Sequence, residues 1–279
     1  MNNQEYLTKL RKAGIKILDS DIVYVAGSLI EGKISSVAEG MGNEYSDVDV
    51  FILRKEQATK IMHTYSINDR SFDFKFVDNT HFDVETYKLE KVKNIFSQIS
   101  NVSFKKNKNV KRQIALPNGW TFTVLNSIIH RLFHSIPLQN EMEWKSLKQE
   151  LDFEKYLHVY SQILKNKIDD TTDDVVGNAI QGTNTLPVSI YVLRQSYIYF
   201  LNMILLANKI TNDREKWTQL KFNNLVEKTG KYISVKQLEQ DLFFKNFDNN
   251  PEETRLFIFK VQNFINDYIE KMETKNEFQ

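Results

Sequence analysis

The chain has 279 residues, of which 41% are hydrophobic and 12% aromatic, and its formal net charge is +1. This length and hydrophobic content suit two domains with real cores and exclude a disordered chain. The near-neutral charge argues against a surface built throughout for nucleic acid, and the absence of cysteine excludes disulfides and thiolate metal sites.

The first residues, MNNQEYLTKLRKAGIKIL, are polar and amphipathic, with no charged start followed by an apolar core. We expect a leading helix there, no membrane contact, and a cytoplasmic protein. The first predicted strand, Ile22-Val23-Tyr24-Val25, stops at Ala26-Gly27-Ser28, where a helix can begin. A helix start would direct backbone N–H groups toward an anion. Gly27 would let the backbone approach a phosphate, and Ser28 would cap the helix or donate its hydroxyl.

The next predicted strand, residues 45–53, alternates, with Asp47 and Asp49 on one face and three apolar residues on the other. Two converging carboxylates repel each other unless a cation offsets their charge. Hard oxygen ligands of this kind suit Mg²⁺. The sequence therefore predicts a magnesium site on this strand.

A third carboxylate should complete the site, and two later strands offer one. Asp83 and Glu85 share a face of the alternating run at residues 81–87, whereas Asp73 lies in the run at residues 71–77. Lys75 follows Asp73 on the same face and would bring a positive charge to a cation site. We therefore favour Asp83, with Glu85 and Asp73 left open.

These residues resemble the pattern of the DNA polymerase β-like nucleotidyltransferase superfamily over roughly residues 20–90: a Gly-Ser turn, an Asp-x-Asp strand and a further Asp. The resemblance implies that Asp47, Asp49 and Asp83 bind Mg²⁺. It also implies that Gly27 and Ser28 grip the nucleoside triphosphate, and that Asp83 helps to activate an acceptor hydroxyl. The stretch between Ser28 and Asp47 is longer than in most members and looks like an insertion between its Glu-Gly pairs.

The character of the chain changes near residue 100. Before it we expect the strands and a helix at residues 88–100, and after it a basic linker at residues 104–112, which is solvated by default. We place the boundary between a nucleotidyltransferase domain, residues 1–113, and a helical substrate-binding or partner domain, residues 114–279. The predicted fold class is α+β followed by a helical bundle.

Helical spacing dominates the second half. The expected helices cover residues 121–135, 141–167, 187–208, 214–229 and 252–272. The most apolar stretch, residues 189–207, contains Arg194, Gln195, Ser196 and Asn202, so we expect a buried helix. His130 and His134 are spaced for one helix face, but no acidic residue lies between them as in a zinc-protease helix. We therefore expect a structural or surface pair.

Parts of this half loosely resemble the helical domains of aminoglycoside and lincosamide adenylyltransferases. The resemblance implies an acceptor cleft with Arg194 and Lys216 near the phosphate or acceptor and Trp217 as a wall. The alternative is structural: Arg194 would pair with Asp173 or Asp174, and Trp217 would belong to the core.

The sequence thus predicts an Mg²⁺-dependent nucleotidyltransferase that transfers a nucleoside monophosphate, AMP from ATP, to a small-molecule acceptor and releases pyrophosphate. The alternative is a nucleotidyltransferase of a toxin–antitoxin or defence system that modifies a protein or tRNA. A nucleotide sensor without catalytic activity is disfavoured because all the carboxylates of the predicted metal site are present. Nucleic acid is not the expected partner, and a homodimer is left open.

Overall fold

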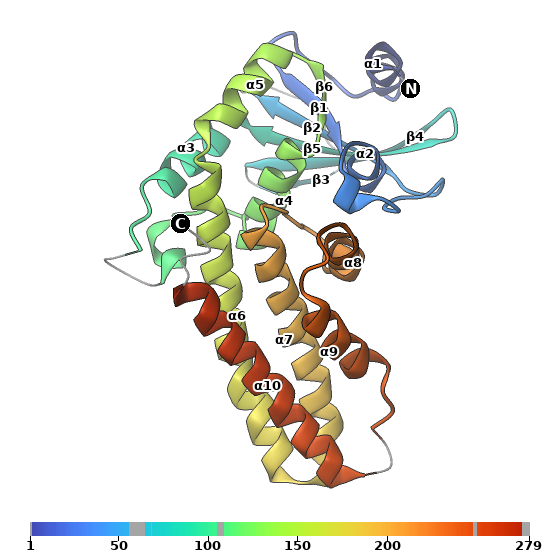
Figure 1. Ribbon diagram of the computed structural model, residues 1–279. Coiled ribbons are helices and arrows are strands. Elements are labelled where there is room, and N and C mark those ends of the chain that lie inside the picture. Colours follow the sequence, from blue (N-terminus) through green and yellow to red (C-terminus); the bar gives the residue numbers. More distant parts are fainter. Residues whose placement is uncertain (1, 56–64, 68, 105–108, 248–249, 275–279) are drawn as a thin grey trace. The chain divides into compact units, whose positions relative to one another are not determined.

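The computed structural model describes residues 2–55, 65–67, 69–104, 109–247 and 250–274 (Figure 1). The chain divides into two compact units, Met1–Tyr156 and Leu157–Gln279. The first unit is built on a mixed sheet with helices and the second is helical, which confirms the predicted fold class.

The division between the units lies later than the predicted boundary after residue 113. The reason is β6 (Ile136–Gln139), which pairs with β1 (Ile22–Ala26) and so belongs to the sheet. Helices α4 (Phe122–Phe133) and α5 (Glu141–Glu150) flank β6 in the chain and lie in the same unit. We predicted only helices beyond residue 121, because the short segment Ile-Pro-Leu-Gln has no clear alternation.

In the described part of the chain, six strands form one sheet in the order β3-β4-β5-β2-β1-β6. The two central strands, β2 and β5, are parallel, and the other neighbours are antiparallel. The remaining strand bounds are β2 Val48–Arg54, β3 Tyr65–Ile67, β4 Arg70–Val77 and β5 Thr80–Lys88.

The two faces of this sheet carry different side chains. One face contributes apolar residues of β1, β2 and β5 to a core shared with α1 (Asn3–Lys12), among them Val25, Val50 and Val84. The other face carries a row of aromatic rings. Phe51 stacks between Tyr24 and Tyr87, with centroids 5.2 Å and 6.2 Å away. Asp49, Asp83 and Glu85 lie on this second face, because side chains alternate along a strand.

The described part of the first unit has further helical elements. The α2 helix (Ser28–Ile34) follows β1 directly, and the 3-10 turn η1 (Ser36–Ala38) lies in the predicted insertion. The α3 helix (Leu89–Ser100) matches the predicted one. The turn η2 (Val110–Gln113) contains Lys111 and Arg112 of the predicted basic linker, whereas Lys105, Lys106 and Lys108 lie outside the described residues.

The helix predicted over residues 141–167 is in fact two helices, α5 and α6 (Phe153–Gln181). Leu151 has an extended backbone, with φ −85° and ψ 123°, which ends α5. Asp152 then accepts a hydrogen bond from the backbone N–H of Lys155 through Oδ1 and starts α6. The apolar spacing continues across this break, so the periodicity did not reveal it.

The second unit contains most of α6 and, in its described residues, four further α-helices: α7 (Leu186–Ala207), α8 (Thr218–Thr229), α9 (Ile233–Phe244) and α10 (Pro251–Thr274). The turns η3 (Thr183–Thr185) and η4 (Glu215–Trp217) precede α7 and α8. We did not predict α9, and η4 and α8 together replace the single helix predicted over residues 214–229.

Among the described residues, one helix, Thr183–Ala207, is long and apolar enough to cross a membrane by length and composition. Of its most apolar window, 61% is buried within the protein. Polar side chains of this helix, including Ser189 and Ser196, are fully buried. These features are typical of a core helix in a folded protein, as predicted.

Candidate functional site

The turn after β1 is in close contact with β2. Gly27 has φ +86°, a backbone conformation that favours glycine. A Cβ added there would lie 1.8 Å from Oδ2 of Asp49. This approach follows from the sheet register, since Ala26 pairs with Asp49 across β1 and β2. The helix α2 begins at Ser28 and has seven residues, and its cap residue is Gly27 rather than Ser28 as predicted, with no side-chain capping hydrogen bond.

Two of the three predicted carboxylates lie side by side. Asp49 and Asp83 are direct partners across the parallel strands β2 and β5, and Glu85 lies two residues further along the same face. Asp47 precedes β2 and is exposed. Asp73 pairs with Val84, so it lies on the opposite face of the sheet, where it is buried. The sheet therefore brings Asp83 and Glu85 to the face of Asp49 and does not bring Asp73 there.

A buried arginine from α4 faces these carboxylates. Arg131 donates from Nη1 to Oδ1 of Asp49 over 2.7 Å, and the same nitrogen lies 3.6 Å from Oε1 of Glu85. Its guanidinium carbon lies 5.3 Å from the centroid of the Phe51 ring. The arginine therefore offsets part of the negative charge and fixes the orientation of Asp49. The sequence placed it on a helix, but no local pattern linked it to a strand so far away in the chain.

Two tyrosine hydroxyls lie near the same acidic group. Tyr87 donates its hydroxyl to Oε2 of Glu85. Burial, and then the charge of Glu85, raise the pKa of Tyr87 well above its ordinary value. Burial and Glu85 also raise the pKa of Tyr24, against the opposing charge of Arg131. Both phenols therefore stay protonated at neutral pH and do not serve as bases.

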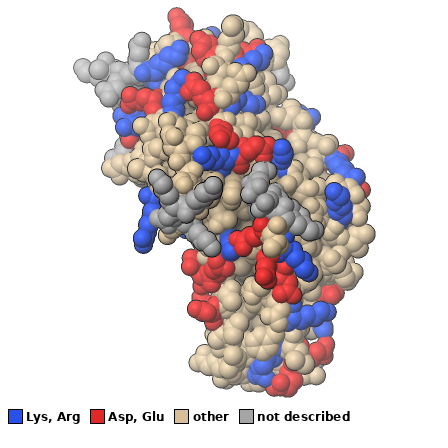
Figure 2. All heavy atoms as spheres, turned by 60° about the vertical axis from the view of Figure 1, so that its left-hand side comes forward, with Lys and Arg blue, Asp and Glu red and all other residues tan. Residues whose placement is uncertain are grey.

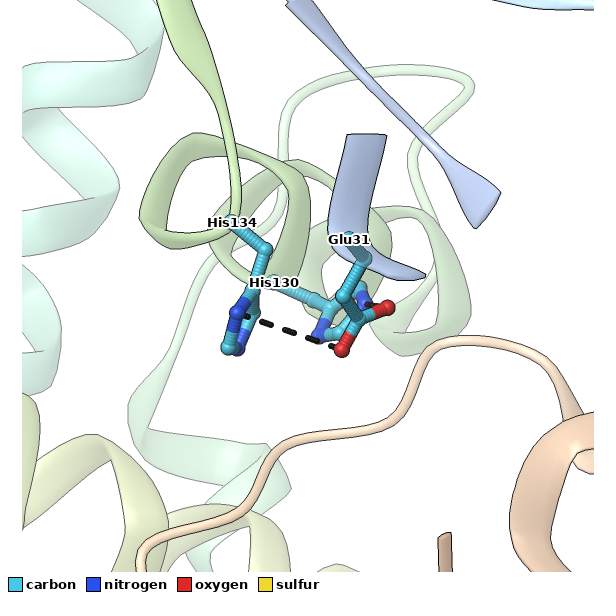
Figure 3. A group of neighbouring side chains, drawn as sticks. All are labelled: Glu31, His130 and His134. Atoms are coloured by element: carbon cyan, nitrogen blue, oxygen red, sulfur yellow. Dashed lines mark hydrogen bonds and ion pairs between the residues drawn. The ribbon is translucent and has the colours of Figure 1, made fainter. Parts of the chain in front are cut away.

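A second cluster joins α2 to α4 (Figure 3). Nε2 of His130 lies 3.0 Å from Oε2 of Glu31, and Nδ1 of His134 lies 3.9 Å from Oε1 of Glu31. Glu31 and His130 are buried, and the His134 side chain is 23% exposed. The sequence predicted a structural or surface pair of histidines, and it missed Glu31 because this acid comes from another helix.

The two predicted contacts in the helical domain lie in the second unit. Arg194 on α7 donates from Nε to the carbonyl oxygen of Leu242 over 3.0 Å, and its guanidinium carbon lies 5.8 Å from the centroid of the Phe243 ring. Lys216 is exposed and its Nζ lies 5.1 Å from the ring of Trp217, which is half-buried. Arg194 therefore ties α7 to the end of α9 through a carbonyl rather than through the aspartates proposed as its alternative partners.

No protein-family model matches the chain, and no curated protein matches it. Among solved structures, a nucleotidyltransferase-like protein from Exiguobacterium sibiricum 255-15 is similar at 8% sequence identity and a TM-score of 0.48. The similarity covers 94% of this chain and 73% of that one. A likeness at this level carries no weight for activity, which has to be inferred from the residues of this chain.

Proposed function

We propose that the first unit is a cytoplasmic, Mg²⁺-dependent nucleotidyltransferase that moves a nucleoside monophosphate, AMP from ATP, to a hydroxyl of a small-molecule acceptor and releases pyrophosphate. One observation carries the proposal. The carboxylate of Asp49 lies against the Gly27 turn and beside Asp83 on the next parallel strand. A turn without a side chain next to two carboxylates suits a phosphate group held by a metal ion.

The donor set supports magnesium. Asp49 and Asp83 offer hard oxygen ligands on one face, and Asp47 comes directly before the strand that carries Asp49. Oδ2 of Asp49 occupies the space beside Gly27 that any side chain would fill. Asp47, Asp49 and Asp83 would therefore hold Mg²⁺, which would neutralise the charge on the triphosphate and orient the α-phosphate for in-line attack.

The other roles in the proposed reaction are assigned to residues of the chain. Gly27 and Ser28 bind the triphosphate through their backbone and the serine hydroxyl. Arg131 holds Asp49 in place through its 2.7 Å hydrogen bond. Asp83 accepts the proton of the acceptor hydroxyl as that oxygen attacks. The bond from the acceptor oxygen to the α-phosphorus forms, the bond to the β-phosphate bridging oxygen breaks, and pyrophosphate leaves.

We assign the third carboxylate to Asp83 rather than Glu85. Glu85 is the register partner of Phe51, two residues beyond Asp49 on β2. Asp83 is the direct register partner of Asp49. In the second unit, Arg194 and Lys216 are proposed to contact the phosphate or the acceptor, and this assignment rests on the sequence resemblance alone.

The test compares three isosteric variants of the sheet. Purified protein is given Mg²⁺, ATP labelled at the α-phosphate, and a metabolite extract, and transfer of label is measured. Asp49→Asn and Asp83→Asn should each lose transfer by about 100-fold or more, because a charge used in the transition state is removed. Asp73→Asn, on the opposite face, is the matched control and should keep turnover per folded molecule.

Circular dichroism and thermal unfolding establish that each variant is folded before its rate is compared. Asp83→Asn should still bind Mg-ATP in a nucleotide titration, because Asp47, Asp49 and the Gly27 turn remain. Wild-type turnover in folded Asp49→Asn, or loss of turnover in Asp73→Asn with retention in Asp83→Asn, would show that the carboxylates are not the reaction centre proposed here.

A further inference from the structure

We propose that Glu31, His130 and His134 form a binding site for one divalent transition-metal ion of the zinc class. This site is built from ligands other than the aspartates of the sheet and does not depend on the proposed nucleotidyl transfer. One carboxylate and two imidazoles are a ligand set that zinc uses with a fourth position open to water.

The ligand atoms converge on one point. One atom from each of the three side chains lies within 4.8 Å of the others. His130 lies in the last turn of α4 and His134 is the C-cap residue of that helix, and their ring centroids are 4.7 Å apart (Figure 3). Ligand atoms about 2.0–2.1 Å from a zinc ion are separated by about 3.3 Å in a tetrahedral site, and the 3.0 Å between Oε2 of Glu31 and Nε2 of His130 is close to that spacing. Nδ1 of His134 lies 3.9 Å from the other carboxylate oxygen, Oε1.

Burial favours a metal over solvation of these groups. Only 2% of the Glu31 side chain and 3% of the His130 side chain are exposed, and Nε2 of His130 and Oε2 of Glu31 are within hydrogen-bond distance of each other. An imidazole binds a metal ion through the lone pair of a ring nitrogen. A divalent cation would use these lone pairs and compensate the buried carboxylate. The 23% exposure of His134 leaves a route for an ion and for a water ligand.

The position of the cluster gives the ion a structural consequence. Glu31 lies on α2, the helix that follows the Gly27 turn, whereas His130 and the C-cap residue His134 lie at the end of α4, on either side of Arg131 in the sequence. An ion held by both helices would fasten α2 to α4 and restrain the backbone that carries Arg131. Because it would bind the folded chain and not the unfolded one, it would also raise the unfolding temperature.

The experiment measures metal binding directly. Untagged protein is stripped with a chelator, and Zn²⁺ affinity and stoichiometry are then determined by competition with a chromophoric chelator. Co²⁺ is titrated in parallel, since its visible absorption reports histidine and carboxylate ligation. We expect one Zn²⁺ and one Co²⁺ per chain, and a Zn²⁺-dependent rise in the unfolding temperature. His134→Ala should weaken Zn²⁺ binding by at least about tenfold and remove the Co²⁺ band.

Two matched controls separate this site from other metal binding. His81→Ala removes an exposed histidine of β5, and Asp49→Asn alters the carboxylates of the sheet; neither should change the Zn²⁺ affinity. Glu31→Gln keeps the size and hydrogen-bonding capacity of the side chain and should weaken Zn²⁺ binding as His134→Ala does. It replaces His130→Ala in the test if that variant, which truncates a buried side chain, does not fold. Absence of a stoichiometric Zn²⁺ site, or equal Zn²⁺ affinity and Co²⁺ spectra in wild type and His134→Ala, would overturn the proposal.

Discussion

At the scale of single residues, the contact between Gly27 and Asp49 is the most demanding feature of the candidate site. Two requirements coincide at this glycine. Its backbone needs a positive φ, and its missing side chain leaves room for a carboxylate oxygen 1.8 Å from where a Cβ would lie. An alanine at position 27 could adopt the positive φ at a cost of about 1–2 kcal/mol. Its Cβ would collide with the Asp49 carboxylate unless Asp49 or the turn moves.

These two requirements can be separated by comparing Gly27→Ala with Gly14→Ala. Gly14 has φ +81° but nothing within 4 Å of an added Cβ, so Gly14→Ala should cost about 1–2 kcal/mol and leave turnover unchanged. Gly27→Ala should cost more and also remove nucleotidyl transfer, since it displaces Asp49. Denaturant unfolding and label transfer from ATP measure the two effects. Equal stability loss and equal activity in both variants would refute the importance of the contact.

Local periodicity placed Asp49 and Asp83 on one face of the sheet, but it did not indicate the partners of the helical residues Arg131 and Glu31, for a physical reason. Asp49 and Asp83 stand in alternating strands, where local periodicity determines the face on which each side chain lies. Arg131 and Glu31 reach their partners from helices, and their roles depend on how those helices pack. That packing is a long-range property, so the helical residues carried no signal of their own beyond the spacing of His130 and His134.

At the scale of elements, α4 brings two groups of side chains into the first unit. Its start is capped by Thr121, which accepts a hydrogen bond from the backbone N–H of Val124. His130 lies in the last turn of α4 and His134 is its C-cap residue, whereas Arg131 is turned by about 100° from His130 and meets the sheet. One helix therefore contributes both to the charge balance of the carboxylates and to the proposed metal cluster.

The elements predicted correctly are those with strong periodicity. The alternating runs gave β2, β4 and β5, and the amphipathic spacing gave α3 and α4 within a few residues. The strand β6 is short and contains Pro137, and α9 follows Tyr232 in a left-handed conformation with φ +63°. Neither carries a long repeating pattern, and the pairing of β6 with β1 could only be found from the assembled sheet.

The α9 helix leads to a prediction about pH. Burial raises the pKa of Glu239 to about 7, against the opposing effects of a hydrogen bond from Gln219 and the charge of Lys236. The folded chain therefore holds this proton more tightly than the unfolded chain, whose value is near 4.5. The bound proton stabilises the folded chain fully at pH values below the pKa of the unfolded chain. This stabilisation is lost as the pH rises through the pKa of the folded chain.

Denaturant unfolding of wild type should accordingly show stability falling between about pH 5 and pH 8. Glu239→Gln should flatten this dependence and be more stable than wild type at about pH 8, by on the order of 1 kcal/mol, because the amide has no charge to bury. Glu270→Gln, at an exposed position of α10, should leave the profile unchanged. A profile that is the same in wild type and Glu239→Gln would contradict the assignment.

At the scale of the whole molecule, charge distribution bears on the kind of acceptor. The chain has 37 basic and 36 acidic residues, and Figure 2 shows Lys and Arg side chains interspersed with Asp and Glu on the face it presents. Proteins bind nucleic acid largely because their basic side chains displace counterions from the phosphates. A surface without a basic excess would release few of these counterions. This balance favours a small-molecule acceptor over the tRNA of the alternative function.

The corresponding experiment is filter binding of RNA across a salt series. We expect a dissociation constant weaker than about 1 μM at physiological salt and a shallow dependence on salt, because few phosphates would be neutralised at once. Lys111→Gln combined with Arg112→Gln, both in η2, should change little. Submicromolar RNA affinity that collapses as salt rises, and that is weakened by the double variant, would instead favour the RNA-modifying function and make the basic segment at residues 104–112 a contact surface.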